Sequence, residues 1–228
     1  MNYRVIKEDD LFLLTDEKGD IVGNHQYELG LYTKDTRFLN SLKLFVNGQS
    51  PIALHSDGGE NYRSRILLTN PHQENEEGLV LWRESIEFER SRFIHNGVLY
   101  ETIKATNYFP KNVSFRVELE MDADFTDMFI VRGFQSGVVG KRGETLLSDC
   151  EMTFTYEGTD SISRKTVVKW DQPEQEVREG YLAFDWSLDH DQSHEVTITI
   201  EPLLDDAESK VSDKHYALSS LQQSYEDW

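Results

Sequence analysis

Residues 113–121 decide the fold class, and they read Val113-Ser114-Phe115-Arg116-Val117-Glu118-Leu119-Glu120-Met121. Apolar side chains alternate with polar or charged ones, a period of two that is typical of a β-strand with one buried face and one face in water. Shorter runs of this kind predict further strands at Leu42–Val46, Ile52–His55, Leu79–Phe88, Val98–Asn107, Leu146–Tyr156, Ile162–Trp170, Tyr181–Trp186 and Val196–Ile200.

Pairs of residues that favour tight turns separate these runs. They are Asn47-Gly48, Asn96-Gly97, Glu157-Gly158 and Glu179-Gly180. The pair Asn96-Gly97 is flanked by apolar residues on both sides, which indicates a β-hairpin. Many short strands without helices between them favour an antiparallel sandwich over an α/β fold. The sequence therefore predicts one all-β domain, an antiparallel β-sandwich, over residues 1–205.

The end of the chain has a different pattern. From Asp213 onward, Leu218, Leu221, Tyr225 and Trp228 recur at helical spacing, which predicts an amphipathic helix with one apolar stripe. Residues 206–228 are therefore expected to be a linker helix that begins a connection to a missing part of the protein. The alternative is a terminal helix that docks on the sandwich.

Charge restricts the classes of partner. The chain has 228 residues, of which 42 are acidic and 23 basic, so the formal net charge is −19. This field repels nucleic-acid phosphates and anionic lipid headgroups, and we predict neither partner. A neutral sugar meets no such repulsion, although the charge could equally serve only solubility.

Several features indicate the cytoplasm. The first ten residues lack the apolar segment of a signal peptide, and no later apolar run is long enough to cross a bilayer. The single cysteine, Cys150, cannot form an intramolecular disulfide, which also favours a reducing compartment. Cys150 lies in a predicted strand and is interpreted as a small buried residue rather than a nucleophile.

Two groups of residues have spacings that can bind metals. His190 and His194 would lie on one face only in a helix, whereas their segment is predicted to be a polar turn that enters a strand. Asp122, Asp124 and Asp127 cluster like calcium ligands, but the glycine and the distal glutamate of the usual loop are missing. We therefore predict no metal, no cofactor and no catalytic residues in this chain.

Three segments taken together resemble a known family. They are Leu13–Ile21 (LLTDEKGDI), Gly30–Leu39 (GLYTKDTRFL) and Asp124–Gly133 (DFTDMFIVRG). In this order they resemble the N-terminal domain of bacterial glycogen-debranching-type enzymes, the amylo-α-1,6-glucosidase family. The resemblance implies a β-supersandwich, then a linker helix, then an (α/α) toroid that carries the acid and base carboxylates. The chain matches only the first part, so no catalytic residue is carried over.

The same segments supply candidate interface residues. Arg37 can bind a carboxylate through two parallel hydrogen bonds, with Asp35 as an orienting neighbour. Asp127 and Arg132 can serve in the same way. We expect these four residues either to hold loops of the sandwich together or to contact the missing catalytic domain and the rim of its α-glucan cleft.

Three functions compete. The leading hypothesis is a non-catalytic domain that supports or shapes the cleft of a glucosidase acting on α-1,6/α-1,4-glucan. The first alternative is a stand-alone sugar-binding module, which needs an exposed aromatic platform. Its candidates are Trp82, Trp170, Tyr181 and Trp186, although each lies in a predicted strand, which favours the core. The second alternative is a mutarotase-like sugar epimerase, which needs a histidine acid and a glutamate base at one sugar.

Overall fold

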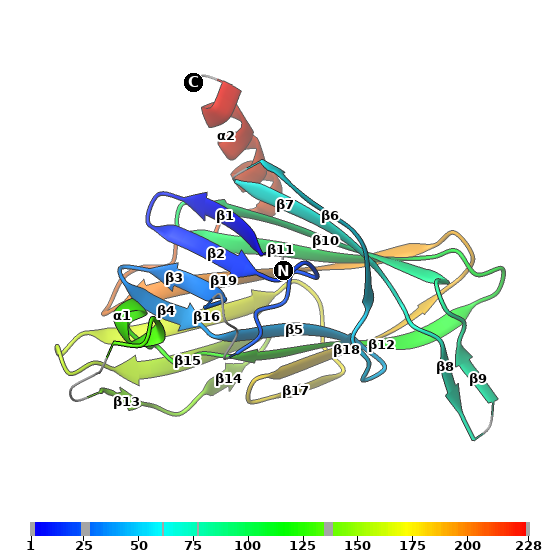
Figure 1. The fold of residues 1–228 in the computed structure, drawn as a ribbon, viewed down its shortest axis with the longest axis horizontal. Helices are drawn as coiled ribbons and strands as arrows, with labels where there is room; N and C mark the ends of the chain where they lie inside the picture. Colours follow the sequence, from blue (N-terminus) through cyan, green and yellow to red (C-terminus); the bar gives the residue numbers. More distant parts are fainter. Residues whose placement is uncertain (1–2, 24–27, 61, 77, 135–138, 227–228) are drawn as a thin grey trace.

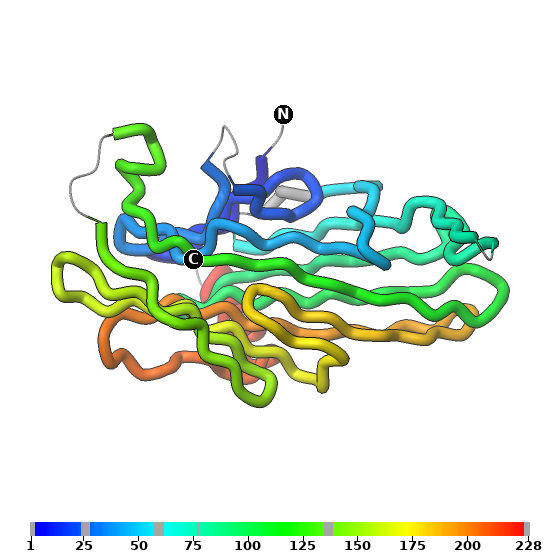
Figure 2. The backbone as a smooth tube through the Cα atoms, turned by 90° about the horizontal axis from the view of Figure 1, so that it is seen from below, coloured from blue at the N-terminus to red at the C-terminus, as the bar shows by residue number. Residues whose placement is uncertain are grey.

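The computed structural model describes residues 3–23, 28–60, 62–76, 78–134 and 139–226. It is built from antiparallel strands, and the predicted all-β sandwich is confirmed. Two layers of strands face each other, and Figure 2 shows them stacked edge-on.

One layer is a large sheet. Its strands follow one another in the order β13-β15-β16-β19-β11-β10-β7-β6, and β14 pairs with β15. Their bounds are β6 (Ile52–Glu60), β7 (Arg63–Thr69), β10 (Ile86–His95), β11 (Val98–Asn107), β13 (Lys141–Arg142), β14 (Leu146–Ser148), β15 (Glu151–Glu157), β16 (Ser163–Trp170) and β19 (Ser193–Leu204).

The other layer contains two four-stranded sheets. The N-terminal one has the order β1-β2-β3-β4, and the second has the order β17-β18-β12-β5. Their bounds are β1 (Arg4–Glu8), β2 (Leu11–Thr15), β3 (Gly30–Thr33), β4 (Thr36–Leu39), β5 (Ser41–Val46), β12 (Val113–Asp122), β17 (Glu176–Arg178) and β18 (Tyr181–Leu188). The remaining pair, β8 (Gln73–Asn75) and β9 (Gly78–Leu81), forms a hairpin that projects from the sandwich in Figure 1.

The alternation in β12 has the predicted effect. Phe115, Val117, Leu119 and Met121 are buried, whereas the residues between them are exposed or half-buried. The ring of Phe115 meets that of Phe88 on β10 edge to face, with 5.7 Å between ring centres. The core thus lies between the large sheet and the opposite layer, as expected for stacked sheets.

The predicted turns are found at strand ends. Asn96 and Gly97 have φ values of 52° and 78° and join β10 to β11 in a two-residue hairpin. A turn of this type needs positive φ at both positions, which Asn and Gly tolerate best. The turns at Asn47-Gly48 and Glu179-Gly180 likewise follow β5 and separate β17 from β18.

Two predicted strands are wrong in extent. The run Leu79–Phe88 is divided into β9 and β10, because the backbone turns at Glu84, whose φ is 56°. The run Leu146–Tyr156 is divided into β14 and β15 by a turn at Cys150, whose φ is 54°. Cys150 is therefore a half-buried turn residue, not a residue inside a strand. The N-terminal sheet and β7 lie where no strand was predicted from the sequence.

The predicted C-terminal helix is present as α2 (Lys214–Glu226), and Asp213 caps it by accepting hydrogen bonds from the backbone of His215 and Tyr216. Ala217 and Leu221 are buried against Phe93 and Tyr100 of the large sheet. Figure 1 shows the far end of α2 projecting beyond the strands. Tyr225 stacks on Tyr62, with 4.1 Å between ring centres. Trp228 lies outside the described residues, and the division at residue 205 stays a prediction.

Candidate functional site

Two of the three segments that carry the family resemblance, Gly30–Leu39 and Asp124–Gly133, meet at one end of the sandwich. Arg37 donates its backbone N–H to the carbonyl of Thr126 at 2.9 Å. Met128 donates its N–H to the carbonyl of Asp35 at 2.8 Å, and Thr36 pairs with Asp127 in an isolated bridge. These backbone bonds hold the β3–β4 hairpin against the loop that follows β12.

A bidentate ion pair reinforces this junction. Arg37 donates through Nε to Oδ1 of Asp124 at 3.1 Å, and through Nη2 to Oδ2 of the same carboxylate. Only 12% of the Arg37 side chain and 25% of the Asp124 side chain are exposed. Burial opposes the charge of Arg37, but the Asp124 carboxylate outweighs this effect and raises the pKa of Arg37 above its usual value. The predicted carboxylate clamp is thus present, with Asp124 as its partner.

Asp35 does not supply the clamped carboxylate. It lies with Lys34 in the two-residue turn between β3 and β4, where both residues have positive φ, 46° and 59°. Aspartate tolerates this conformation better than most residues, which explains its place there. Its side chain is exposed, and its carbonyl is the group that holds Met128.

Asp127 and Arg132 lie at the two ends of α1 (Met128–Val131). The carboxylate of Asp127 caps this short helix by accepting a hydrogen bond from the N–H of Phe129 at 2.7 Å. Arg132 follows the helix, and its Nε lies 3.6 Å from a carboxylate oxygen of Glu28, with both side chains largely in water. Asp127 therefore stabilises the junction as a helix cap, whereas Arg132 lies at the surface.

A pocket of about 520 Å³ opens beside the junction. Asp124 and Asp127 line one side, and Arg142, Tyr156, Asp160 and Arg164 line the other. Arg164 binds Asp160 at 2.7 Å and lowers the pKa of that carboxyl to about 2. Arg142 binds Asp122 at 2.7 Å. The pocket thus presents fixed charged groups of both signs.

Exposed apolar side chains stand next to this pocket. Phe129, Phe134 and Val139 are 54%, 63% and 62% exposed, and we call these three residues the apolar rim. The rings of Phe129 and Phe134 meet edge to face with 5.9 Å between their centres. Val139 also lines the pocket. Large apolar groups gathered beside fixed charges are typical of a surface that binds another protein surface or a ligand.

The four aromatic candidates for sugar stacking differ in exposure. Trp170, Tyr181 and Trp186 are buried, so they present no free ring face. Trp170 donates its indole N–H to Glu174 at 2.8 Å, and the Tyr181 hydroxyl bonds to Glu118 at 2.9 Å. Trp82 is 51% exposed, and its ring meets the ring of His72 edge-on. Trp82 is therefore the one of the four that offers a free ring to a sugar.

The residues tested for metal binding are engaged separately. His190 contacts the carbonyl of Phe109, whereas His194 contacts the side chain of Gln172. The carboxylates of Asp122, Asp124 and Asp127 bind Arg142, Arg37 and a backbone N–H respectively. Among the described residues there is no group of three or more His, Cys, Asp or Glu placed to hold a metal ion. In the same part of the chain, no helix has the length and apolar character needed to cross a membrane.

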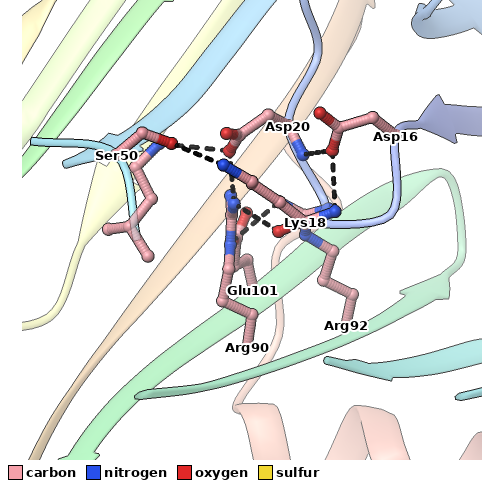
Figure 3. A network of polar contacts seen from close by, with 8 residues as sticks. Asp16, Lys18, Asp20, Ser50, Arg90, Arg92 and Glu101 are labelled. Carbon is pink, nitrogen blue, oxygen red and sulfur yellow. Dashed lines mark hydrogen bonds and ion pairs between the residues drawn. The ribbon is translucent and has the colours of Figure 1, made fainter. Parts of the chain in front are cut away.

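The remaining segment, Leu13–Ile21, has a different role, which was not predicted from the sequence. Figure 3 shows that its turn delivers Asp20 to a buried arginine of the large sheet, Arg90. Arg90 lies between Oδ1 of Asp20 at 2.5 Å and Oε1 of Glu101 at 2.7 Å. Arg92 also binds Oε1 of Glu101, at 2.9 Å. These four residues form a buried charge cluster that joins the N-terminal layer to the large sheet.

In this buried charge cluster two carboxylates balance the charge of two guanidinium groups, but some of the guanidinium nitrogens have no hydrogen-bond acceptor in the described part of the chain. Nη2 of Arg90 and both Nε and Nη1 of Arg92 have no partner among the described residues. Burial disfavours the charge of Glu101, yet the two guanidinium groups outweigh it and lower the pKa of Glu101. One feature of the sequence could have predicted the buried charge cluster. In the strand that begins at Ile86, Arg90 and Arg92 share the period-two face of Phe88, which is the core face.

Comparison with known proteins places the fold in a family. Residues 6–199 match the family described as the N-terminal domain of (some) glycogen debranching enzymes. A search of curated proteins found no match to this chain.

Solved structures share the fold at low identity. A galactose mutarotase-like protein from Lactobacillus casei has a TM-score of 0.50 at 8% identity, covering 89% of this chain and 100% of that one. The Slr1438 protein of Synechocystis has a TM-score of 0.51 at 9% identity, covering 88% and 95%. A protein labelled a kojibiose phosphorylase from the human microbiome has a TM-score of 0.49 at 11% identity. In that case 91% of this chain is covered, but the chain spans only 28% of the phosphorylase.

Proposed function

Because this chain belongs to the family of N-terminal domains of (some) glycogen debranching enzymes, we propose that it is a non-catalytic part of a debranching-type glucosidase. The substrate of the whole enzyme is an α-glucan with α-1,6 and α-1,4 linkages, and the enzyme works in the cytoplasm. The catalytic carboxylates belong to an (α/α) toroid in the same polypeptide. The present domain supports that toroid or shapes one side of its cleft.

One observation carries this proposal. Two of the three family segments meet at the Arg37–Asp124 pair, and the loop that they fix in place carries the apolar rim. The ion pair and the backbone bonds hold the loop from inside, so Phe129 and the neighbouring pocket face outward in a defined position. A preorganised apolar surface of this kind lowers the entropic cost of docking. We assign the docking of the catalytic domain to the apolar rim.

The test uses the polypeptide that carries this chain together with its catalytic domain. We expect Phe129→Ser combined with Phe134→Ser to lower debranching activity and to separate the melting transitions of the two domains. Leu54→Ser is the matched control, because Leu54 is 55% exposed on β6, outside the apolar rim. Equal activity and a single unchanged transition in the Phe129 and Phe134 variant would refute the assignment.

The stand-alone sugar-binding module remains the second candidate, and the half-exposed ring of Trp82 favours it. The loop around this ring is rigid, because the Trp82 carbonyl accepts hydrogen bonds from Asn70 Nδ2 and Ser85 Oγ, both at 2.6 Å. Under this alternative, the isolated chain binds α-glucan and Trp82→Ala abolishes the binding. The epimerase alternative predicts that the isolated chain accelerates the mutarotation of glucose, which polarimetry measures directly.

A further inference from the structure

The outer face of the large sheet carries a groove of about 840 Å³, which α2 closes at one end. The strands β7, β10, β11 and β19 form its floor, and Lys214, His215 and Leu218 of α2 line its wall. Figure 1 shows these four strands side by side with α2 at their end. A volume of this size is in the usual range for small-ligand sites.

Strand register determines which side chains share the floor. Ser91 on β10 lies opposite Thr102 on β11, and Thr102 lies opposite Thr197 on β19. This row therefore consists of three short hydroxyl side chains, of which Ser91 and Thr102 line the groove. Arg65 on β7 ends the row, since it pairs with Ser91 in register. Short side chains in the centre of a sheet face leave a depression between longer neighbours.

The next row on the same face consists of charged residues. Glu89, Lys104 and Glu195 are successive cross-strand neighbours on β10, β11 and β19. Two further cationic side chains bind the carboxylates of Glu89 and Glu195. Arg65 binds Glu89 at 2.6 Å, and Lys214 reaches from α2 to Glu195 at 3.1 Å.

These charges are held in fixed positions. Ser91 donates its hydroxyl to Glu89 at 2.8 Å. The Nζ of Lys214 lies 3.3 Å from the Thr102 hydroxyl and 3.2 Å from the Thr197 hydroxyl. The groove thus offers donors, acceptors and hydroxyls in alternation, and neighbouring groups orient Glu89, Glu195 and Lys214.

We propose that this groove binds a short stretch of an α-glucan chain. A polyhydroxylated, neutral ligand can both donate and accept at every hydroxyl, which matches alternating ammonium, carboxylate and hydroxyl groups. The carboxylates of Glu89 and Glu195 are already paired with Arg65 and Lys214, so the groove does not demand a cationic ligand. The net charge of −19 penalises an anionic ligand but not a neutral one. The identity of the glucan rests on the proposed function.

The experiment titrates the chain with a linear α-1,4-linked glucose hexasaccharide and follows backbone amide shifts by NMR. We expect saturable shifts centred on β10, β11 and the first turn of α2. Thr102→Val removes a floor hydroxyl at constant shape, and Lys104→Met removes a donor at an exposed position. Each is expected to weaken binding about two- to tenfold, the effect of one lost hydrogen bond.

The matched control is Thr106→Val. Thr106 lies on β11 on the same face as Thr102, but outside the groove, and its hydroxyl contacts Ser193. We expect its affinity to equal that of the unmodified chain. A β-1,4-linked hexasaccharide of the same length and inorganic phosphate are the competing probes.

Three results would overturn the proposal. The first is an absence of shifts with the α-linked hexasaccharide, and the second is an equal loss of affinity in Thr106→Val. The third is binding of phosphate that depends on Lys104 while the hexasaccharide does not bind. None of these results touches the proposed function, which is decided by the Phe129 and Phe134 variants of the longer enzyme.

Discussion

At the scale of single residues, the Arg37–Asp124 ion pair joins two segments that are far apart in the sequence. We expect Arg37→Ala to lower the free energy of unfolding by about 2–3 kcal/mol, the usual value for a partly buried hydrogen bond to a charged group. Urea denaturation of the isolated chain measures this change. The loss arises because the Asp124 carboxylate loses both guanidinium donors and keeps only those of Thr126, while only 25% of its side chain is exposed.

Arg116→Ala is the matched control for this measurement. Arg116 also forms a two-pronged pair, with Asp185, but 36% and 46% of these side chains are exposed. Exposed pairs contribute about 1 kcal/mol or less. If both variants lost the same small amount, Arg37 would be an ordinary surface residue and the junction would rest on its backbone bonds alone.

The buried charge cluster predicts how stability depends on pH. The pKa of Glu101 is lower in the folded chain than its usual value, because Arg90 and Arg92 favour its charged form. A group of this kind contributes stability above its unfolded pKa, and the contribution is lost as pH falls through the folded pKa. Asp20 acts in the opposite sense, because burial raises its pKa.

We therefore compare Glu101→Gln with the unmodified chain. Glutamine keeps the shape but removes the charge between two buried guanidinium groups, so we expect a loss of about 3–5 kcal/mol at neutral pH. As pH falls below the usual glutamate pKa, the difference between the two proteins is expected to shrink. Melting temperatures from pH 7 downward measure it. A difference that stays constant with pH would show that folding does not lower the pKa of Glu101, and one that grows as pH falls would show that Glu101 is uncharged in the folded chain.

At the scale of elements, α2 is attached to the sheet at its beginning and projects at its end. Its buried residues are Ala217 and Leu221, which contact the stacked rings of Phe93 and Tyr100. Further along, Tyr225 is 47% exposed and touches Tyr62 alone among the ring contacts of the described residues. The apolar surface that holds the helix thus decreases along its length.

Hydrogen exchange is expected to follow this gradient. Amides near Leu221 exchange slowly, and those near Tyr225 exchange rapidly, because local opening is easiest where few apolar contacts hold the chain. Leu221→Ala should remove protection throughout α2 while β10 and β11 stay protected. Tyr216→Ala is the control, since Tyr216 is 65% exposed on the same helix. Slow exchange through the last turn would show a self-contained docked helix and would end the interpretation of α2 as a connector.

At the scale of the whole molecule, the prediction concerns activity. We expect the isolated chain to release no glucose from α-1,6- or α-1,4-linked glucan, because the proposed acid and base lie in the toroid. Glucose release is measured against a mock preparation that is purified in the same way from cells that do not express the chain. Turnover that is equal in both preparations indicates contamination, whereas turnover found only with the chain would refute the non-catalytic assignment.

Much of the strand pattern, though not the N-terminal sheet, was predicted from the sequence alone. Apolar alternation in Val113–Met121 identified β12 and its buried face, and Asn96-Gly97 identified the hairpin between β10 and β11, because period and turn chemistry are local properties. The break at Glu84 was not predicted, because it depends on a side chain that is distant in the sequence. The Oδ1 atom of buried Asn70 accepts hydrogen bonds from the backbone N–H groups of Ser85 and Ile86, which divides the run.

The partners of charged residues were decided only by the tertiary structure. Sequence indicated that Arg37 could clamp a carboxylate, but among 42 acidic residues it could not select Asp124, which is 87 positions away. The same holds for Arg90 with Asp20, and for the row of Ser91, Thr102 and Thr197 across three strands. Strand order and register bring such residues together. For strands that no tight turn joins, such as β11 and β19, the packing of the two layers decides which strands become neighbours, and no local turn fixes their pairing.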